Sequence, residues 1–112
     1  MKYIKKFENL NFPEVGEYVI CEADKLLFNN LNDFLLAHVG QLIKIGNRNT
    51  MPYVIEFDVL YDDFPELKNY RATNYSDELK KLRIEFSRKE IIYISKDKEY
   101  LESILATNKY NL

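Results

Sequence analysis

The sequence predicts an α+β protein that is mainly β. Five short runs have the residue patterns of strands, two segments carry apolar residues at helical spacing, and turn-forming residues separate these runs. Together they indicate a small, strongly bent antiparallel sheet of five strands, or an SH3-like barrel, with a short helix after the first strand and a helix at the C-terminus. An open α+β sheet is the alternative architecture.

The clearest strand signal lies between residues 39 and 61, where two β-type runs flank the turn-forming residues 46–50. We expect strands at 40–46 and 52–60. Alternate residues of a strand share a face, so the second strand has one apolar face and one acidic face. The apolar face consists of Tyr53, Ile55, Phe57, Val59 and Tyr61, and the acidic face of Glu56, Asp58 and Asp62.

The other elements follow from the same patterns. The remaining strands are expected at 15–22, 80–86 and 91–94, and the helices at 31–38 and 96–107. Asn30 or Asn32 is a candidate cap for the first helix, Gly40 follows its end, and Ser95 is expected to cap the second helix. Cys21 lies within the first strand, where we expect a small buried side chain.

Two segments are less regular. Residues 1–12 form an N-terminal arm whose spacing fits both a short amphipathic helix and an extended strand. Residues 61–79 form a long insertion without sustained periodicity, in which Asp63 is placed to start one helical turn through Asn69. Loops of this length in compact domains are usually functional or disordered, so this insertion is the best candidate for a binding surface.

Composition limits the classes of function. The chain has 112 residues, enough for a single domain spanning 1–112, and a formal net charge of −2. Nonspecific nucleic-acid binding usually requires a strongly basic domain, so this charge balance argues against that class. One Cys and one His exclude an intramolecular disulfide and an ordinary zinc site. No apolar run resembles a secretory signal or a membrane span, so we expect a cytoplasmic protein, without metal or cofactor.

Charged residues gather in two places. Glu56 and Asp58 face solvent on one expected strand, and Lys81 and Arg83 do so on its expected partner, so ion pairs across the sheet explain them without a ligand. The functional alternative concerns the acidic residues Glu56, Asp58, Asp62, Asp63 and Glu66. They could bind a divalent cation, or they could imitate a row of phosphates for a nucleic-acid-binding protein. The candidate partner-binding set consists of Tyr61, Asp62, Asp63, Phe64, Glu66, Tyr70, Arg71 and Tyr75. The competing candidate set, for nucleic acid, consists of Lys80, Lys81, Arg83, Arg88 and Lys89.

No residue pattern predicts catalysis. The sequence has no nucleophile elbow, no phosphate-binding glycine loop and no paired His and carboxylate at ligand spacing. The single histidine, His38, ends the first expected helix, where a surface or capping role is typical. We therefore expect a protein that is not an enzyme.

Four segments carry a resemblance to a known group of proteins. They are K-Y-I-K-K-F-E at 2–8, V-G-E-Y-V-I at 15–20, V-G-Q-L-I-K-I at 39–45 and F-S-R-K-E-I-I-Y-I-S-K-D-K-E at 86–99. This combination resembles small SH3-like barrel proteins encoded by bacteriophages and prophages of low-GC bacteria. The resemblance implies a virus or a mobile element as the context, in which small ordered proteins often bind and block host machinery, including CRISPR nucleases. It carries no catalytic residues.

Three functional hypotheses follow. The first is a non-enzymatic phage or prophage protein that binds a host protein or ribonucleoprotein and inhibits it, as an anti-CRISPR protein does. This hypothesis is favoured because exposed Tyr side chains in loops are common anchors of protein interfaces. The second is a small-barrel module that binds RNA or DNA. The third is an oligomeric phage component with a structural or regulatory role.

Overall fold

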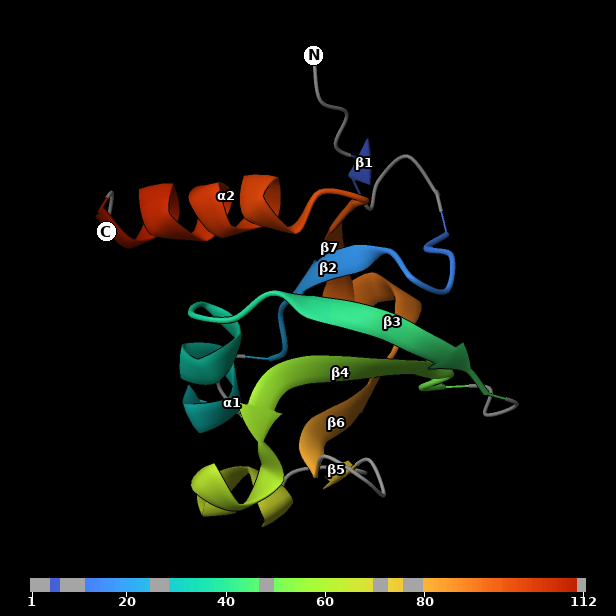
Figure 1. Cartoon of the computed structure of the whole chain (residues 1–112), viewed down its shortest axis with the longest axis vertical. Coiled ribbons are helices and arrows are strands. Elements are labelled where there is room, and N and C mark those ends of the chain that lie inside the picture. The colour runs from blue at the N-terminus through green and yellow to red at the C-terminus, as the bar shows by residue number, and fades with distance from the viewer. Residues whose placement is uncertain are drawn as a thin grey trace.

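A computed structural model of the chain describes residues 5–6, 12–24, 29–46, 50–69, 73–75 and 80–110. Its elements, in chain order, are β1 (Lys5–Lys6), β2 (Tyr18–Cys21), α1 (Asn29–Leu35), β3 (Gly40–Ile45), β4 (Tyr53–Leu60), η2 (Tyr61–Asp63), η3 (Pro65–Asn69), β5 (Thr73–Tyr75), β6 (Lys81–Phe86), η4 (Arg88–Glu90), β7 (Ile91–Ser95) and α2 (Lys98–Tyr110). The three η elements are short 3-10 turns. The fold is α+β and mainly β, as the sequence predicts (Figure 1).

The strands of the described part form one antiparallel sheet in the order β1-β7-β2-β3-β4-β6-β5. All five expected strands are present, and the short strands β1 and β5 extend the sheet at its two ends. No pairing joins β1 to β5 in the described residues, so the sheet is open and the SH3-like barrel is not confirmed. Irregular registers in β2, β3 and β4 bend the sheet, because a bulge kinks the strand that carries it.

The N-terminal arm and the first strand differ from their expected forms. Lys5 and Lys6 pair with Ile94 and Tyr93, so this part of the arm is extended, and its other residues lie outside the described part. The expected strand at 15–22 is shorter, because Gly16 occupies a turn with φ +99°, a backbone conformation that favours glycine. The ladders with the neighbouring strands therefore begin at Tyr18, although the Gly16 N–H already donates to the Leu42 carbonyl of β3 at 2.7 Å.

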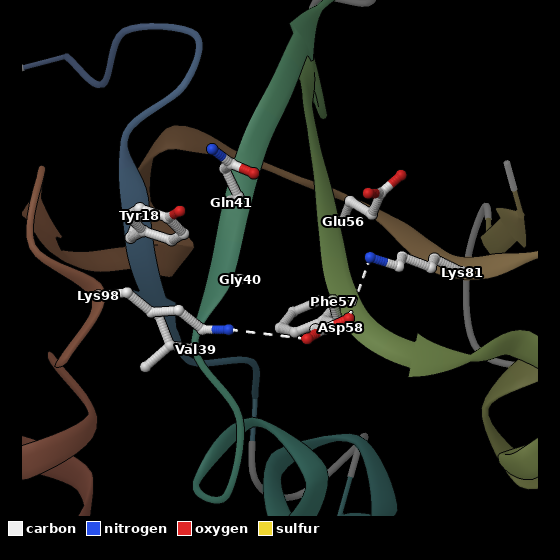
Figure 2. Close-up of a pocket in the computed structure, with 9 residues that line it drawn as sticks. All are labelled: Tyr18, Val39, Gly40, Gln41, Glu56, Phe57, Asp58, Lys81 and Lys98. Carbon is white, nitrogen blue, oxygen red and sulfur yellow. Dashed lines mark ion pairs between the residues drawn. The ribbon is translucent and has the colours of Figure 1, made fainter. Parts of the chain in front are cut away.

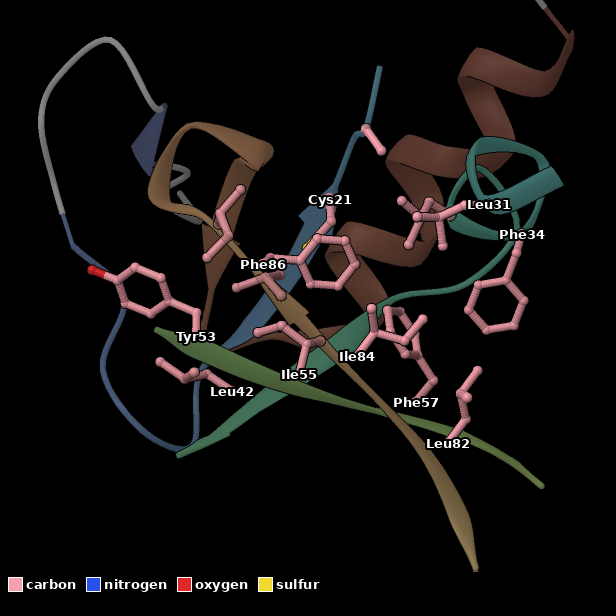
Figure 3. Close-up of a cluster of buried hydrophobic side chains, with 14 of the residues drawn as sticks. Cys21, Leu31, Phe34, Leu42, Tyr53, Ile55, Phe57, Leu82, Ile84 and Phe86 are labelled. Atoms are coloured by element: carbon pink, nitrogen blue, oxygen red, sulfur yellow. The ribbon is translucent and has the colours of Figure 1, made fainter. Parts of the chain in front are cut away.

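The main core lies on one face of the sheet. Inward-facing residues of β4 alternate as expected, since Tyr53, Ile55 and Phe57 are buried and Val59 is half-buried against the same cluster. Facing residues of β3, β6 and β7 complete the cluster, and Cys21 is buried within it. Figure 3 shows these side chains converging from several strands, with Phe34 of α1 closing one end beside Phe57.

Helix α2 lies against the opposite face of the sheet, over β2 and β7 (Figure 1). Leu101 and Leu105 pack there with Ile20 and Val39 in a second buried cluster. Because both faces of β2 and β7 are covered, β7 is apolar on both sides, as its sequence indicates. Among the described helices, none is both long and apolar enough to cross a membrane.

The caps of both helices differ from the expected ones. Asp97, rather than Ser95, caps α2, because its Oδ1 accepts the Tyr100 N–H at 3.1 Å; Ser95 Oγ accepts the Asp97 N–H at 3.0 Å. Helix α2 therefore begins at Lys98 and continues to Tyr110, beyond the expected end at 107. Both residues are good cap formers two positions apart, and sequence alone does not separate them.

Asn32 is inside α1 and does not cap it. Its side chain instead makes two hydrogen bonds with the backbone of Ala23, which follows β2. The helix ends at Leu35, earlier than expected, and Gly40 belongs to β3 rather than to a helix terminus. Gly40 is there because a Cβ at this position would run into the Ile55 side chain and would lie 2.9 Å from Cε1 of Phe57.

Candidate functional site

The segment that follows β4 is compact, although the sequence gives it no sustained periodicity. In η2 and η3 the Phe64 N–H donates to the Tyr61 carbonyl at 3.4 Å, and the Leu67 N–H to the Phe64 carbonyl at 3.1 Å. The expected helical turn through Asn69 is confirmed by η3. Strand β5 corrects the expectation that the rest of 61–79 lacks regular structure; three residues are too few to show a strand period.

Apolar side chains anchor this segment to the core. Leu67 is buried, and the half-buried Tyr61 and Phe64 pack against the same cluster. The Phe64 ring lies edge-to-face against Phe34 of α1, with 4.8 Å between the ring centroids. In Figure 1, α1 lies directly beside the two 3-10 turns. This packing holds the backbone of η2 and η3 in place, so that the neighbouring polar side chains project from a fixed support.

Apart from Pro65, the exposed side chains among residues 61–67 are acidic. Asp62, Asp63 and Glu66 are all exposed. Asp33, on the outer side of α1, is exposed as well, and it lines the same groove as Glu66. Four carboxylates therefore lie on three neighbouring elements, α1, η2 and η3, at one end of the molecule. Asp33 is absent from the expected set because only the folded chain brings α1 next to η3.

The expected partner-binding residues are only partly gathered. Five of them lie on the compact segment at 61–66: Tyr61, Asp62, Asp63, Phe64 and Glu66. Tyr75 belongs to β5, the edge strand next to β6, where it pairs with Leu82, and β5 lies close to η3. Tyr70 and Arg71 lie outside the described residues. Tyr61 and Phe64 contribute mainly as anchors of the segment, because both pack against the core.

The acidic residues of β4 form the expected ion pairs with β6. Arg83 Nε lies 2.9 Å from Glu56 Oε2, and these two residues are directly opposite in the register of the strands. Lys81 Nζ lies 3.0 Å from Asp58 Oδ1. Neither carboxylate therefore needs a ligand to account for its position.

The pair of Asp58 and Lys81 shifts the titration of both groups. The hydrogen bond from Lys81, and then its positive charge, lower the pKa of the Asp58 carboxyl below its ordinary value of 3.8. The same hydrogen bond and the charge of Asp58 raise the pKa of Lys81 above 10.5. The two shifts agree in sign, as they must when each charge stabilises the other.

The nucleic-acid-binding set is not assembled into one patch. Lys81 and Arg83 are engaged by carboxylates on β4. Lys80 and Lys89 are exposed, but they flank opposite ends of β6, about 20 Å apart along an extended strand. The structure therefore offers no continuous basic track along the described part of β6.

The Arg88 side chain is held by contacts within the protein. Its guanidinium carbon lies 5.3 Å from the centroid of the Phe12 ring, and its Nη1 donates to the Ile91 carbonyl at 3.3 Å. Burial lowers the pKa of the Arg88 guanidinium from its ordinary value. This arginine packs at the turn between β6 and β7, which is the polar turn expected at 87–90.

A polar cleft lies on the outer face of the sheet, between the start of α2 and β4. Figure 2 shows Asp58 between two lysines, Lys81 of β6 and Lys98 of α2, whose Nζ lies 4.0 Å from Asp58 Oδ2. Tyr18 of β2 and Gln41 of β3 also line the cleft. The cleft encloses ≈ 170 Å³, which is less than the ~300 Å³ at which sites for small organic molecules begin. Its charges are matched within the protein, so it links α2 to the sheet.

The described residues do not form a metal site. They contain no group of three or more His, Cys, Asp or Glu side chains placed to hold a metal ion. His38 is half-buried, and its Nδ1 lies 2.9 Å from the Phe34 carbonyl oxygen of the preceding helix. A carbonyl oxygen only accepts hydrogen bonds, so Nδ1 carries the hydrogen and serves as a helix-end donor.

Comparisons with known proteins give no relative for this chain. No family model, no curated protein and no solved structure matches it.

Proposed function

We propose that this chain is a non-enzymatic phage or prophage protein that binds a host protein and inhibits it by occupying its surface. The class of partner that fits best is a nucleic-acid-binding protein, such as a CRISPR effector or another defence nuclease. The observation that carries this proposal is the acidic end of the molecule, where Asp33, Asp62, Asp63 and Glu66 are exposed on the adjoining elements α1, η2 and η3.

Charge complementarity supports a basic partner. Proteins that bind nucleic acid present clustered Lys and Arg side chains to phosphates, and an acidic surface steers itself toward such clusters. The acidic end rests on the buried Leu67 and on the packed ring of Phe64. A fixed backbone loses less conformational freedom on binding than a mobile loop, which favours affinity.

Binding of RNA or DNA by this chain has less support. Two of the five basic residues expected to contact phosphates, Lys81 and Arg83, already pair with carboxylates at 3.0 and 2.9 Å. A phosphate would have to displace Asp58 or Glu56 to reach them. Direct nucleic-acid binding would reveal itself as affinity for labelled single strands that falls steeply with salt.

A capture experiment with matched charge reversals tests the proposal. The immobilised chain is exposed to lysates of low-GC bacteria and to purified CRISPR nucleases, and captured nucleases are assayed for cleavage. One variant carries Asp62→Lys and Asp63→Lys, at the acidic end. The control carries Glu99→Lys and Glu102→Lys, which gives the same net charge from α2, on the other side of the sheet.

We expect the unchanged chain and the α2 control to capture a basic protein and inhibit it, and the Asp62/Asp63 variant to lose capture by tenfold or more. Thermal melts of both variants check that the fold is intact. Equal capture by both variants, or no nuclease inhibited by the unchanged chain, would refute the proposal.

A further inference from the structure

A groove separates α1 from the segment formed by η2 and η3. Its described lining includes Asp33, Ala37 and His38 on the α1 side, and Phe64 and Glu66 on the other. Phe34 lies beneath them and contributes to the floor. The groove is therefore built from two elements that are distant in sequence and held together by aromatic packing.

The floor of the groove is aromatic and ordered. The rings of Phe34 and His38 are stacked, with 4.2 Å between centroids and 17° between planes. The Phe64 ring is nearly perpendicular to both, and its centroid lies 4.8 Å from that of Phe34 and 5.8 Å from that of His38. Phe34 is buried, so the accessible ring surface belongs to the half-buried His38 and Phe64, and the face of a π-system attracts cations.

The rim of the groove is negatively charged. Asp33 stands on one wall and Glu66 on the other, and both are exposed. No Lys or Arg is among the described residues that line the groove. His38 carries its hydrogen on Nδ1, so the other ring nitrogen of the neutral imidazole is an acceptor. Carboxylates on both sides of an aromatic floor form a site that favours a cation.

We infer that this groove binds an arginine side chain presented by the partner protein. A guanidinium is planar, so it stacks on aromatic rings and also donates hydrogen bonds in its own plane to carboxylates, whereas an ammonium is a compact and strongly hydrated charge. The inference rests on the proposed function only in naming a protein as the source of the arginine. The aromatic floor of the groove would then select arginine over lysine, a specificity that the carboxylates alone do not supply.

A titration with single-residue probes tests this inference. The ¹⁵N-labelled chain is titrated with N-acetyl-arginine methylamide while backbone amide shifts are recorded. N-acetyl-citrulline methylamide, which has nearly the same shape and no charge, is the matched control probe. N-acetyl-lysine methylamide with a free ε-amine separates an arginine site from a general cation site.

We expect saturable shifts at Ala37, His38 and Phe64, with a Kd on the order of millimolar for a probe this small. Citrulline should bind at least about fivefold more weakly. Asp33→Asn and Glu66→Gln should each weaken arginine binding about two- to fivefold. Glu102→Gln, an exposed change on α2, should leave it unchanged.

Other outcomes overturn the inference. Absence of saturable shifts, or equal binding of citrulline and arginine, would show that the groove does not select the charge. Lysine binding as tightly as arginine would refute the assignment to a guanidinium. If the groove fails to bind arginine while capture of a nuclease still depends on Asp62 and Asp63, only this inference falls. If arginine binds and no partner is captured, only the proposed function falls.

Discussion

The side-chain amide of Asn32 pairs with the backbone of Ala23 in both directions. Asn32 Oδ1 accepts the Ala23 N–H at 2.8 Å, and Asn32 Nδ2 donates to the Ala23 carbonyl at 2.7 Å. Both residues are buried, so the N–H and carbonyl of Ala23 have little access to water as an alternative hydrogen-bond partner. The asparagine therefore supplies hydrogen-bond partners for the backbone N–H and carbonyl of Ala23, just after β2, and it fixes α1 beside that point.

Replacing Asn32 should be strongly destabilising. Asn32→Asp keeps the shape, but at neutral pH it sets a carboxylate oxygen against the Ala23 carbonyl and leaves a buried charge. Asn32→Ala leaves both Ala23 groups without their partner. We expect a loss of about 1–3 kcal/mol for Ala, and more for Asp, in the free energy of unfolding measured by urea titration.

The control for this prediction is the adjacent exposed position. Asp33→Asn introduces the same amide and acid chemistry on the solvent side of α1, and should change stability by less than about 0.5 kcal/mol. Equal effects at positions 32 and 33 would contradict the role of the buried pair.

A second prediction concerns the close packing under β3. Gly40→Ala places a methyl group against the Ile55 side chain and 2.9 Å from Phe57 Cε1. Both neighbours are buried, and they must shift to make room. We expect a loss of about 1–3 kcal/mol by the same urea titration, as is usual when a packed core is overfilled.

Gly46 provides the matched control. Among the described residues, a Cβ there meets only the Pro52 carbonyl oxygen, at 3.6 Å, an ordinary contact distance. Gly46→Ala should therefore be close to neutral. If Gly40→Ala is equally well tolerated, a methyl group fits at position 40, and the predicted clash with Ile55 and Phe57 is wrong.

The third prediction is a pH dependence that comes from Asp58. Its pKa lies below 3.8 in the folded chain, so its ionised form stabilises the fold above about pH 4, and this contribution fades as pH falls through the folded pKa. Lys81, whose pKa is raised above 10.5, acts in the opposite range. Its share is complete below the unfolded pKa and is lost as pH rises through the folded value.

Asp58→Asn should therefore lower Tm at neutral pH by a small amount, and this difference should shrink as the pH is lowered toward about 2. Because Asp58 is largely exposed, the difference should shrink further in high salt. Thermal melts of both chains across this pH range, with Glu102→Gln as the exposed control on α2, measure it. A difference that stays constant down to about pH 2 would exclude the ion pair as its source.

Sequence reasoning succeeded where the signal is a local period. The alternation in β4 predicts which face is buried, and the pairing of β4 with β6 then predicts the contacts of Glu56 with Arg83 and of Asp58 with Lys81. These inferences need only a period of two residues and an antiparallel neighbour.

Features created by distant parts of the chain were not predicted. The groove joins Asp33 to Glu66 only because Phe34 and Phe64 pack together. Lys98 reaches Asp58 only after α2 has folded back over the sheet. Asparagine commonly caps helices, which is why Asn32 is expected to be a cap. No local sequence pattern predicts its buried hydrogen bond to Ala23.

The last prediction concerns Asp97 as the N-terminal cap of α2. Asp97 Oδ1 accepts the Tyr100 N–H, and its negative charge also lies at the positive end of the helix dipole. Asp97→Ala should lower the free energy of unfolding by about 0.5–2 kcal/mol, measured by urea titration, because it removes both effects. Asp97→Asn keeps the acceptor without the charge, so it should retain most of the stability. In high salt the loss of stability caused by Asp97→Asn should nearly vanish, since only the charge is screened. The loss caused by Asp97→Ala should remain in part, because the hydrogen bond is missing as well. If Ala and Asn are equally damaging at position 97, the hydrogen bond to Tyr100 is not what caps the helix.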